Sequence, residues 1–375
     1  MSPHEDPDRA DCKEVIEFET GGAPAPPVLI QGRYMERRYR KISISLFTVL
    51  ITLLLASSSF AAGLCCQLSS GVQESLSGVA APASEEISVQ FTYSFTRMDK
   101  LKQGTSSKSL DEASASTSYT SLPISMDMIK YTVTAGYGFS SRFKAFVSLP
   151  YLRNTMAMTM SGGVGLGWME MTMEPVSKPG DATAMGLYRI YADQDLQPTA
   201  ALTLGLGVKT PTGSSTETTA GGGYLHAHMQ PGTGSWDPLL SLLYTRMLSA
   251  IDLQGDVTRQ FTTRNRQGYE FGDSTSITVS AKYTAMRLFD PGMGITYLHT
   301  GRANDRDGRY SDLTSLMDDP ANTGGDSLWV SPGIQVFPFR QLVVDVKIQV
   351  PVWEKVNGIQ LVSSYRLLSG LTYRF

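Results

Sequence analysis

Methionines recur at every second position in two neighbouring segments of the sequence. The first set is Met126, Met128, Met156, Met158 and Met160. The spacing continues after a glycine-rich stretch at Met169, Met171 and Met173. Every second side chain of an extended strand lies on one face, so these flexible thioethers would form a surface suited to varied apolar ligands. They could instead pack on one another or bind Cu(I), which prefers soft sulfur ligands. All three interpretations stay open.

Charged side chains alternate with apolar ones in several other segments. They are Lys130, Lys144, Asp252, Asp256, Lys282, Asp345, Lys347, Arg366 and Arg374. If the apolar positions face lipid, the alternate positions, including the five methionines of the first set, face the interior of a pore. The signs of these charges are mixed, and an enclosed charge needs a partner. The sequence therefore predicts either a structural salt-bridge network or a lining that selects solutes.

Enzyme and metal chemistry find little support among the histidines. His226 and His228 form a His-x-His pair in a glycine-rich stretch without a nearby carboxylate, so we expect a solvated loop there. His299 stands at the end of an alternating segment, and no serine nucleophile is evident as its partner. We therefore predict no enzyme activity, no cofactor and no metal site.

The elements that must position these side chains are strands. From residue 85 onward, apolar and polar residues alternate with period two, which is typical of half-buried strands. Twelve segments show this pattern: 85–97, 125–139, 142–158, 180–192, 197–209, 234–247, 250–262, 272–285, 287–300, 326–337, 341–351 and 363–375.

The connections between these segments alternate in length. Tight turns of one to four residues separate the second segment from the third, the fourth from the fifth, and so on. The other connections are long: 98–124, 159–179, 210–233, 263–271, 301–325 and 352–362. Short turns at one end and long loops at the other are the layout of an outer-membrane barrel. A secreted β-sandwich would also alternate, but it would not need aromatic residues at the ends of its apolar faces, such as Tyr93, Tyr137, Tyr283 and Tyr373.

We therefore predict an all-β protein, a transmembrane antiparallel β-barrel of about twelve strands over residues 85–375. Its composition agrees, because 18% of the residues are charged and 41% are hydrophobic. A barrel whose strands alternate can sit in a bilayer with such an average.

Three stretches precede the barrel. Residues 35–61 have a basic start, an apolar run and small residues up to Ala61, which predicts a cleavable secretory signal peptide. Residues 1–34 are acidic and proline-rich, so we interpret them as a non-native upstream extension, with translation starting at Met35, or as disordered chain. Residues 62–84 would be a periplasmic segment or a plug that folds back into the lumen.

The three cysteines of the chain all lie in this region. Cys12 belongs to the upstream stretch, whereas Cys65 and Cys66 are adjacent and are too close to staple a loop. The barrel itself is therefore expected to have no disulfide framework and no cysteine-based metal site.

The chain ends in "LLSGLTYRF", an alternating segment with Tyr373 and Phe375 on its apolar face. We expect it to be the closing strand and to pair with the first strand around residues 87–95. A terminal Phe on an aromatic, alternating strand resembles the signal read by the bacterial barrel-assembly machinery.

Five phrases, in this order and spacing, resemble a known family. They are "FVSLPYLRN", "LGLGVKTPTG", "GTGSWDPLLSLLYTR", "GGDSLWVSPGIQV" and "QVPVWEKVNGIQLVSSYRLLSGLTYRF". The chain is similar over most of residues 85–375 to the outer-membrane transporter family labelled meta-pathway of phenol degradation. The resemblance implies a barrel with a proposed role in the uptake of aromatic compounds.

The sequence thus predicts an exported protein of the bacterial outer membrane. We expect a passive or gated channel for small, apolar or aromatic molecules. A non-transport barrel with a structural or surface-interaction role is the alternative, and an outer-membrane barrel hydrolase is a third interpretation. The expected partners are outer-membrane lipid and lipopolysaccharide, the assembly machinery and the solute. A net charge of −3 gives no indication of nucleic-acid binding.

Overall fold

A computed structural model describes residues 85–375, except 163–166, 196, 220 and 311–313. The described residues belong to the second of two compact units, Ser58–Phe375. The predicted upstream extension, signal peptide and plug segment lie outside the described residues, and so do the three cysteines. Among the described helices, none has the length and hydropathy needed to cross a bilayer.

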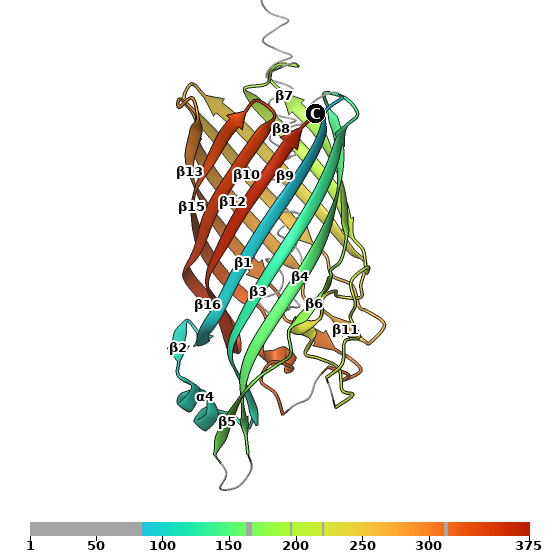
Figure 1. The fold of residues 1–375 in the computed structure, drawn as a ribbon, viewed down its shortest axis with the longest axis vertical. Helices are drawn as coiled ribbons and strands as arrows, with labels where there is room; N and C mark the ends of the chain where they lie inside the picture. The colour runs from blue at the N-terminus through green and yellow to red at the C-terminus, as the bar shows by residue number, and fades with distance from the viewer. Residues whose placement is uncertain (1–84, 163–166, 196, 220, 311–313) are drawn as a thin grey trace, which may run out of the picture. The chain divides into compact units, whose positions relative to one another are not determined.

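Eleven strands of the described chain, each hydrogen-bonded to its neighbour, form one closed wall (Figure 1). They are β1 (Ile87–Gly104), β3 (Ser121–Gly138), β4 (Phe143–Ser161), β7 (Thr183–Ala192), β8 (Ala200–Lys209), β9 (Asp237–Leu248), β10 (Ile251–Gln260), β12 (Ser274–Tyr283), β13 (Phe289–Thr300), β15 (Gly325–Phe339) and β16 (Leu342–Arg374). Neighbours in the wall follow the order of the chain, and pairing of β16 with β1 closes the ring. Closure leaves no open edge, which is what a sheet in lipid requires.

β16 folds back on itself and crosses the wall twice. Its first half, up to Val356, pairs antiparallel with β15, and its second half pairs antiparallel with β1. The backbone is left-handed at Gly358 (φ 57°), where the chain reverses. The amide of Arg374 donates to the carbonyl of Gln341 at 2.9 Å, so the two ends of this hairpin lie side by side. Eleven named strands with one counted twice give twelve crossings, the even number that an all-antiparallel ring needs.

The predicted strands are confirmed in order and face, but one predicted long loop is wrong. The stretch 352–362 is strand on both sides of a tight turn at Asn357-Gly358. Asn-Gly is a strong hairpin signal, so the sequence held the information. The predicted loop 98–124 is also shorter than expected, because β1 runs on to Gly104 and β3 starts at Ser121.

The long connections contain short elements of their own. These are β2 (Ser106–Lys108), α4 (Leu110–Ser116), β5 (Trp168–Thr172), β6 (Val176–Pro179), η1 (Ala227–Met229), β11 (Tyr269–Glu270), β14 (Asn304–Asp305) and η2 (Pro320–Asn322). α4 starts at a capping box, in which the Ser109 hydroxyl accepts from the Glu112 amide and the Glu112 carboxylate accepts from the Ser109 amide. β5 and β6 pair with the C-terminal half of β4, over residues 151–161.

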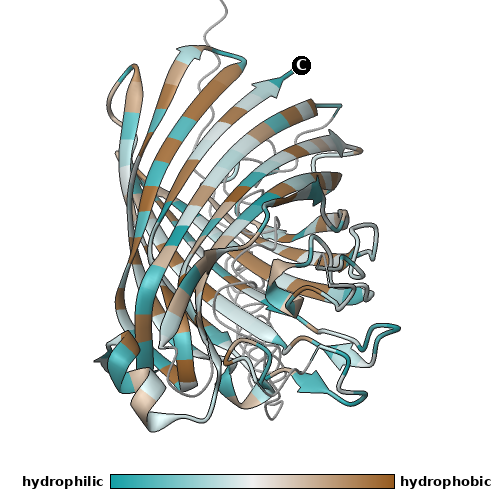
Figure 2. Ribbon diagram, turned by 60° about the horizontal axis from the view of Figure 1, so that its bottom comes forward, coloured by the Kyte–Doolittle hydropathy of each residue, from teal (hydrophilic) through white to brown (hydrophobic). Residues whose placement is uncertain are grey.

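Apolar and polar residues alternate along the strands (Figure 2), and the burial of their side chains shows that the apolar ones lie on the outer face. On β1, Ile87, Val89 and Phe91 are exposed, whereas Ser88 and Gln90 between them are buried. Aromatic residues gather where the short turns are. The ring of Phe139 is tilted against that of Phe143 with 5.4 Å between centroids, and the ring of Tyr373 lies edge-on to that of Phe375 with 4.7 Å between centroids. We refer to this end, which carries the C-terminus in Figure 1, as the turn end and to the opposite end as the loop end.

The wall is higher on one side than on the other. β1, β3 and β4 have 18, 18 and 19 residues, whereas β7, β8 and β10 have 10 each. The high side therefore extends beyond the low side at the loop end, and the long connections fold against its inner face.

Candidate functional site

Three long connections close the loop end of the barrel. We term the connections 210–236, 261–273 and 301–324 the loop cap. A buried apolar cluster joins the loop cap and α4 to the inner face of the high side of the wall. Its members are Met98, Leu101, Ala113, Leu122, Met126, Met128, Met156, Met158, Val176, Leu225, Met229, Leu316, Met317, Ile359 and Leu361. Wall and cap residues thus share one core, so the cap is held in place by apolar packing.

Four of the five methionines singled out in the sequence belong to this cluster. Met126 and Met156 lie directly opposite each other on β3 and β4, and both are fully buried. Met160 lies outside the cluster and is 42% exposed, contrary to its expected inward position. Met169 and Met171 on β5 are also exposed, because that hairpin extends past the cap, whereas Met173 packs against the cluster.

Replacing Met156 by alanine is expected to loosen the loop cap. A buried methionine cut back to alanine loses contacts worth about 2–5 kcal/mol, and Met156 is fully buried between wall and cap. Limited proteolysis of the folded protein should then cleave the cap faster. Met171→Ala is the matched control, because Met171 is 46% exposed. Equal cleavage of the two variants would contradict a closing role for the cluster.

A buried ionic group holds two connections of the cap to the barrel rim. Lys209, the last residue of β8, contacts Asp181 at 3.2 Å and Asp237 at 2.7 Å. All three side chains are at least nine-tenths buried. Asp237 also accepts from the amide of Thr263 at 3.0 Å, in the connection 261–273. The sequence does not reveal this group, because its members are far apart in the chain and carry no motif.

The connection 210–236 is tied to Asp181 through its backbone. The amides of Gly213 and Thr233 donate to the two carboxylate oxygens of Asp181, at 3.0 and 2.8 Å. A Cβ on Gly232 would lie 2.5 Å from Asp181 Oδ1 and from the carbonyl oxygen of Gly213. Only glycine lets the backbone approach this closely, so the turn is fitted to the carboxylate.

The His-x-His pair lies in the cap and is not solvated, so the prediction of a solvated loop is wrong. His226 Nδ1 lies 2.7 Å from Asp318, which joins connection 210–236 to connection 301–324. His228 is 4% exposed and lies edge-on to Phe271. Burial lowers the pKa of His228 to about 4 from an ordinary value of 6.5, and the neighbouring His226 lowers it further.

Acidification is therefore expected to open the cap. Between pH 6.5 and about 4, His228 is protonated when the cap is open and exposes it to water, but stays neutral when the cap buries it. The stability of the closed cap is therefore highest above pH 6.5. It falls as the pH decreases, by up to about 3 kcal/mol at pH 4. Proteolytic cleavage of the cap should accelerate over this range. His228→Phe should flatten the change, since phenylalanine does not titrate, and an unchanged profile in that variant would contradict the role of His228.

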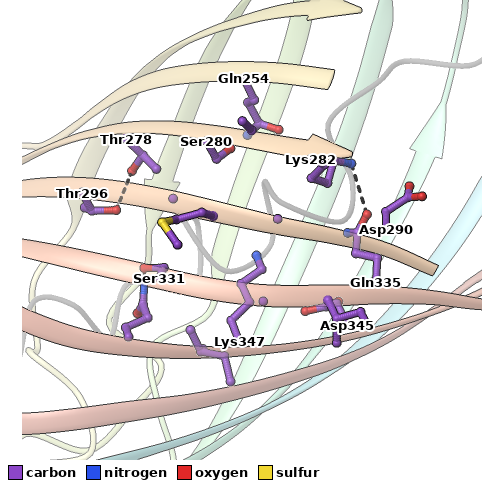
Figure 3. Close-up of a pocket in the computed structure, with 18 of the residues that line it drawn as sticks. Gln254, Thr278, Ser280, Lys282, Asp290, Thr296, Ser331, Gln335, Asp345 and Lys347 are labelled. Carbon is purple, nitrogen blue, oxygen red and sulfur yellow. Dashed lines mark hydrogen bonds between the residues drawn. The ribbon is translucent and has the colours of Figure 1, made fainter. Parts of the chain in front are cut away.

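Inside the barrel lies a polar cavity of about 130 Å³ (Figure 3). Three acidic and three basic side chains line it: Asp256, Asp290, Asp345, Lys282, Lys347 and Arg366. Lys282 donates to Gln335 at 3.1 Å and lies 3.4 Å from Asp252, and Thr278 bonds Thr296 at 3.1 Å. The cavity therefore offers hydrogen-bonding groups of both kinds with no excess of either charge.

The nine charged residues predicted to face inward are not one network. Five of them line this cavity: Asp256, Lys282, Asp345, Lys347 and Arg366. Asp252 contacts one of the five, Lys282. Lys144 pairs with Glu86 at 3.3 Å near the turn end. Arg374 is exposed at the rim, because the strand ends there.

A second cavity of about 80 Å³ lies between the loop cap and the inner face of the wall, mainly against β3 and β4. Met128 and Leu152 line it together with Lys130 and the buried Asp181 and Lys209. It shares Met128 with the apolar cluster and Asp181 and Lys209 with the ionic group. The second cavity therefore lies directly beneath the loop cap.

The third histidine considered in the sequence, His299, lies next to an acidic side chain. His299 lies 2.8 Å from Asp326, which also accepts from Tyr297. No serine hydroxyl of the described residues forms a hydrogen bond with His299. Among the described residues, no group of three or more histidine, cysteine or acidic side chains could hold a metal ion.

Comparisons with known proteins identify the fold. No family model matches the chain, and no curated protein matches it. The chain is similar to the COG4313 outer membrane channel from Pseudomonas putida F1, with 14% identity and a TM-score of 0.52 over 78% of this chain and 96% of that one. The fold is that of an outer-membrane β-barrel. The narrower resemblance to the phenol-pathway family stays a prediction.

Two further solved structures are less similar. One is a Pseudomonas aeruginosa FadL homologue, with 10% identity and a TM-score of 0.39 over 79% of this chain and 93% of that chain. The other is the toluene transporter TbuX of Ralstonia pickettii, with 9% identity and a TM-score of 0.40 over 78% and 90%. We draw no argument from either.

Proposed function

We propose that this protein is a gated channel for small molecules in a bacterial outer membrane. The observation that carries the proposal is a polar cavity inside a closed barrel, covered at one end by a cap that is held only by side-chain and backbone contacts. Such a cap can move without breaking the wall. The solved Pseudomonas putida protein, described as an outer membrane channel, has this fold.

The orientation follows from the lengths of the connections. Outer-membrane barrels have short periplasmic turns and longer external loops, so we place the turn end in the periplasm and the loop cap outside. The exposed apolar side chains, such as Val133, Leu149 and Ile295, would then contact lipid. The aromatic residues at the turn end would lie at the inner interface.

For the solute, we propose small apolar or aromatic molecules without net charge, in line with the proposed role in aromatic uptake that the family resemblance implies. The methionine-rich cluster is buried while the cap is closed, and an open cap would expose it as an adaptable apolar surface at the external end. The cavity behind it balances three acidic against three basic side chains, so it favours neither cations nor anions. The two features together suit a neutral solute with an apolar body.

The test is conductance in planar bilayers combined with solute flux into liposomes. We expect discrete openings and faster entry of benzyl alcohol than of benzoate, which has a similar size but carries a charge. Liposomes without protein give the background flux. Equal entry of the two solutes would be consistent with a channel but would contradict the proposed preference for uncharged apolar solutes.

The runner-up, a non-transport barrel with a surface role, predicts a different outcome. Neither conductance nor flux should then appear, even in a variant whose cap has been released. That result would overturn the channel proposal. A barrel hydrolase would need a nucleophile beside His299. The side chain that hydrogen-bonds to His299 is the carboxylate of Asp326.

A further inference from the structure

Six methionines occupy one face of the hairpin that β4 and β5 form. They make three cross-strand pairs, Met156 with Met173, Met158 with Met171 and Met160 with Met169. Residues directly opposite each other in an antiparallel pair share a face, with Cβ atoms about 4.5–5.5 Å apart. Every position on this face, over residues 156–160 and 169–173, is therefore a methionine. We term these six residues the methionine ladder.

The methionine ladder runs from the core to the surface. At its inner end, Met156 and Met158 are buried in the apolar cluster, against which Met173 packs. The three residues of its outer end are between 42% and 60% exposed: Met160, Met169 and Met171. They lie on the part of the hairpin that projects beyond the loop cap (Figure 1). Core packing thus explains the inner methionines but not the outer ones.

Sulfur is the property that the outer methionines share. An apolar strand surface is ordinarily built from β-branched and aromatic residues, which favour strands, and none of them stands on this face. The opposite face of the same hairpin is mixed and includes Thr159, Glu170 and Thr172. Neither apolarity nor strand propensity requires a face made only of thioethers.

Thioethers discriminate strongly among metal ions. They are soft ligands and select Cu(I), whereas Ca²⁺ and Mg²⁺ take oxygen ligands. Zinc sites use thiolate, imidazole or carboxylate groups. Neutral ligands leave the charge of a bound ion uncompensated, so a univalent ion is held at lower cost than a divalent one. The carboxylate nearest in sequence, Glu170, stands opposite Thr159 and so belongs to the other face.

We propose that Met160, Met169 and Met171 bind a soft univalent cation, Cu(I) or Ag(I), outside the loop cap. Met160 and Met169 are direct cross-strand neighbours, and Met171 stands diagonally from Met160 on the same face. Long side chains reach across both spacings, and methionine has three rotatable bonds, so the three sulfur atoms can converge on a single ion. The expectation of no metal site rested on histidines and cysteines, and the ladder contains neither. The site goes beyond the proposed channel and does not depend on transport.

Competition with the chelator bicinchoninate for Cu(I), in the absence of oxygen, tests the site. The full-length protein in detergent carries serine in place of its cysteines, so that no thiolate binds the metal. We expect a single Cu(I) per chain, with sulfur ligands in the X-ray absorption spectrum, and no comparable binding of Zn²⁺.

Leucine at all three outer positions, Met160→Leu, Met169→Leu and Met171→Leu, should weaken Cu(I) binding by about a hundredfold or more. Loss of a residue that merely supports a metal ligand already costs about 10–100-fold, and here the ligands themselves are lost. Leucine is similar in size and apolarity, so the change removes sulfur and keeps the apolar surface. Met169→Leu alone, at the most exposed position, repeats the test if the triple variant does not fold.

Three other exposed methionines supply the matched control. Met247 on β9, Met286 in the turn before β13 and Met293 on β13 are 51%, 41% and 55% exposed, and they are far apart in the strand order. Leucine at these three positions removes the same number of exposed thioethers and should leave the affinity for Cu(I) unchanged.

Several results would overturn the proposal. They are equal affinity of the parent and the ladder variant, an equal loss in the control variant, and binding of Zn²⁺ as tight as that of Cu(I). If the ladder variant altered the entry of benzyl alcohol but not Cu(I) binding, the outer ladder would be a surface for apolar solutes and not a metal site. A protein that binds Cu(I) as expected but does not conduct would keep the metal site while the channel proposal fell.

Discussion

Replacing Lys209 by methionine is expected to release the loop cap and raise the conductance of the barrel. Lys209 stands between Asp181 and Asp237, and the carboxylates are 5% and 0% exposed. Removing one partner of a buried ion pair costs about 3–5 kcal/mol, because the remaining charge is left uncompensated in a poorly solvated place. Here two carboxylates lose the same cation.

Release of the cap relieves this cost, because both carboxylates then reach water. Asp181 holds the amides of Gly213 and Thr233, so connection 210–236 would lose its attachment when Asp181 moves. A shift of this size raises the open population by at least about a hundredfold. Single-channel recording should show longer and more frequent openings, and cap proteolysis should accelerate in parallel.

Lys178→Met is the matched control for this experiment. Lys178 also reaches connection 210–236, through a 2.7 Å contact with Glu217, but its side chain is 50% exposed. Exposed ion pairs contribute about 0–1 kcal/mol, so this variant should behave like the parent protein. If the two variants gave the same conductance, the buried group would not be the anchor of the cap.

Deleting Phe375 is expected to impair assembly far more than it affects the folded barrel. In the structure the ring is 71% exposed and contacts Tyr373, and the amide donates to the carbonyl of Ile87 at 2.9 Å. Losing one rim hydrogen bond and one exposed ring contact costs about 1–2 kcal/mol. The rest of β16 still pairs with β1, so the ring remains closed.

Assembly should suffer more, because the sequence pattern predicts that the assembly machinery reads this terminal aromatic residue. We expect the amount of folded protein in outer membranes to fall about tenfold or more, while refolded protein keeps nearly the same resistance to urea. Phe339→Ala is the control, because it removes another aromatic ring at the turn end, 68% exposed, and leaves the C-terminus intact. Normal membrane levels after deletion of Phe375 would remove the assembly signal.

The strands could be predicted because their signal is local. Side chains alternate across a strand with period two, and lipid on the outside makes the outer face apolar along its whole length, as in Ile87, Val89 and Phe91. Register follows from the same pattern, since a slip by one residue would turn every apolar side chain inward. The pairing of the last strand with residues 87–95 was therefore correct.

The stretch 352–362, predicted as a loop, shows that strand periodicity must be combined with turn-forming residues. The charged residues Glu354 and Lys355 continue the alternation of the strand, and Glu354 is buried against Lys102 at 2.9 Å. The Asn357-Gly358 dipeptide marks the turn. Turn chemistry, weighed with periodicity, would have placed two strands there.

The loop cap could not be predicted, because its contacts join residues far apart in the chain. Asp181 and Lys209 are 28 positions apart, and His226 and Asp318 are 92 apart. The residues around one partner contain no pattern that predicts which distant residue it contacts. The same holds for the methionines, whose spacing showed a shared face but not the cap residues Leu225 and Leu316 that bury it.

By itself, the sequence determined the barrel: its strand order, its lipid-facing side, its turn end and its closing strand. These follow from a backbone period and from the chemistry of lipid, which act on every residue in turn. Only the tertiary structure decided that the loop end is capped, which charges face the cavity and which methionines are buried. Those features depend on which side chains meet across the lumen, and closure of the ring fixes that in three dimensions.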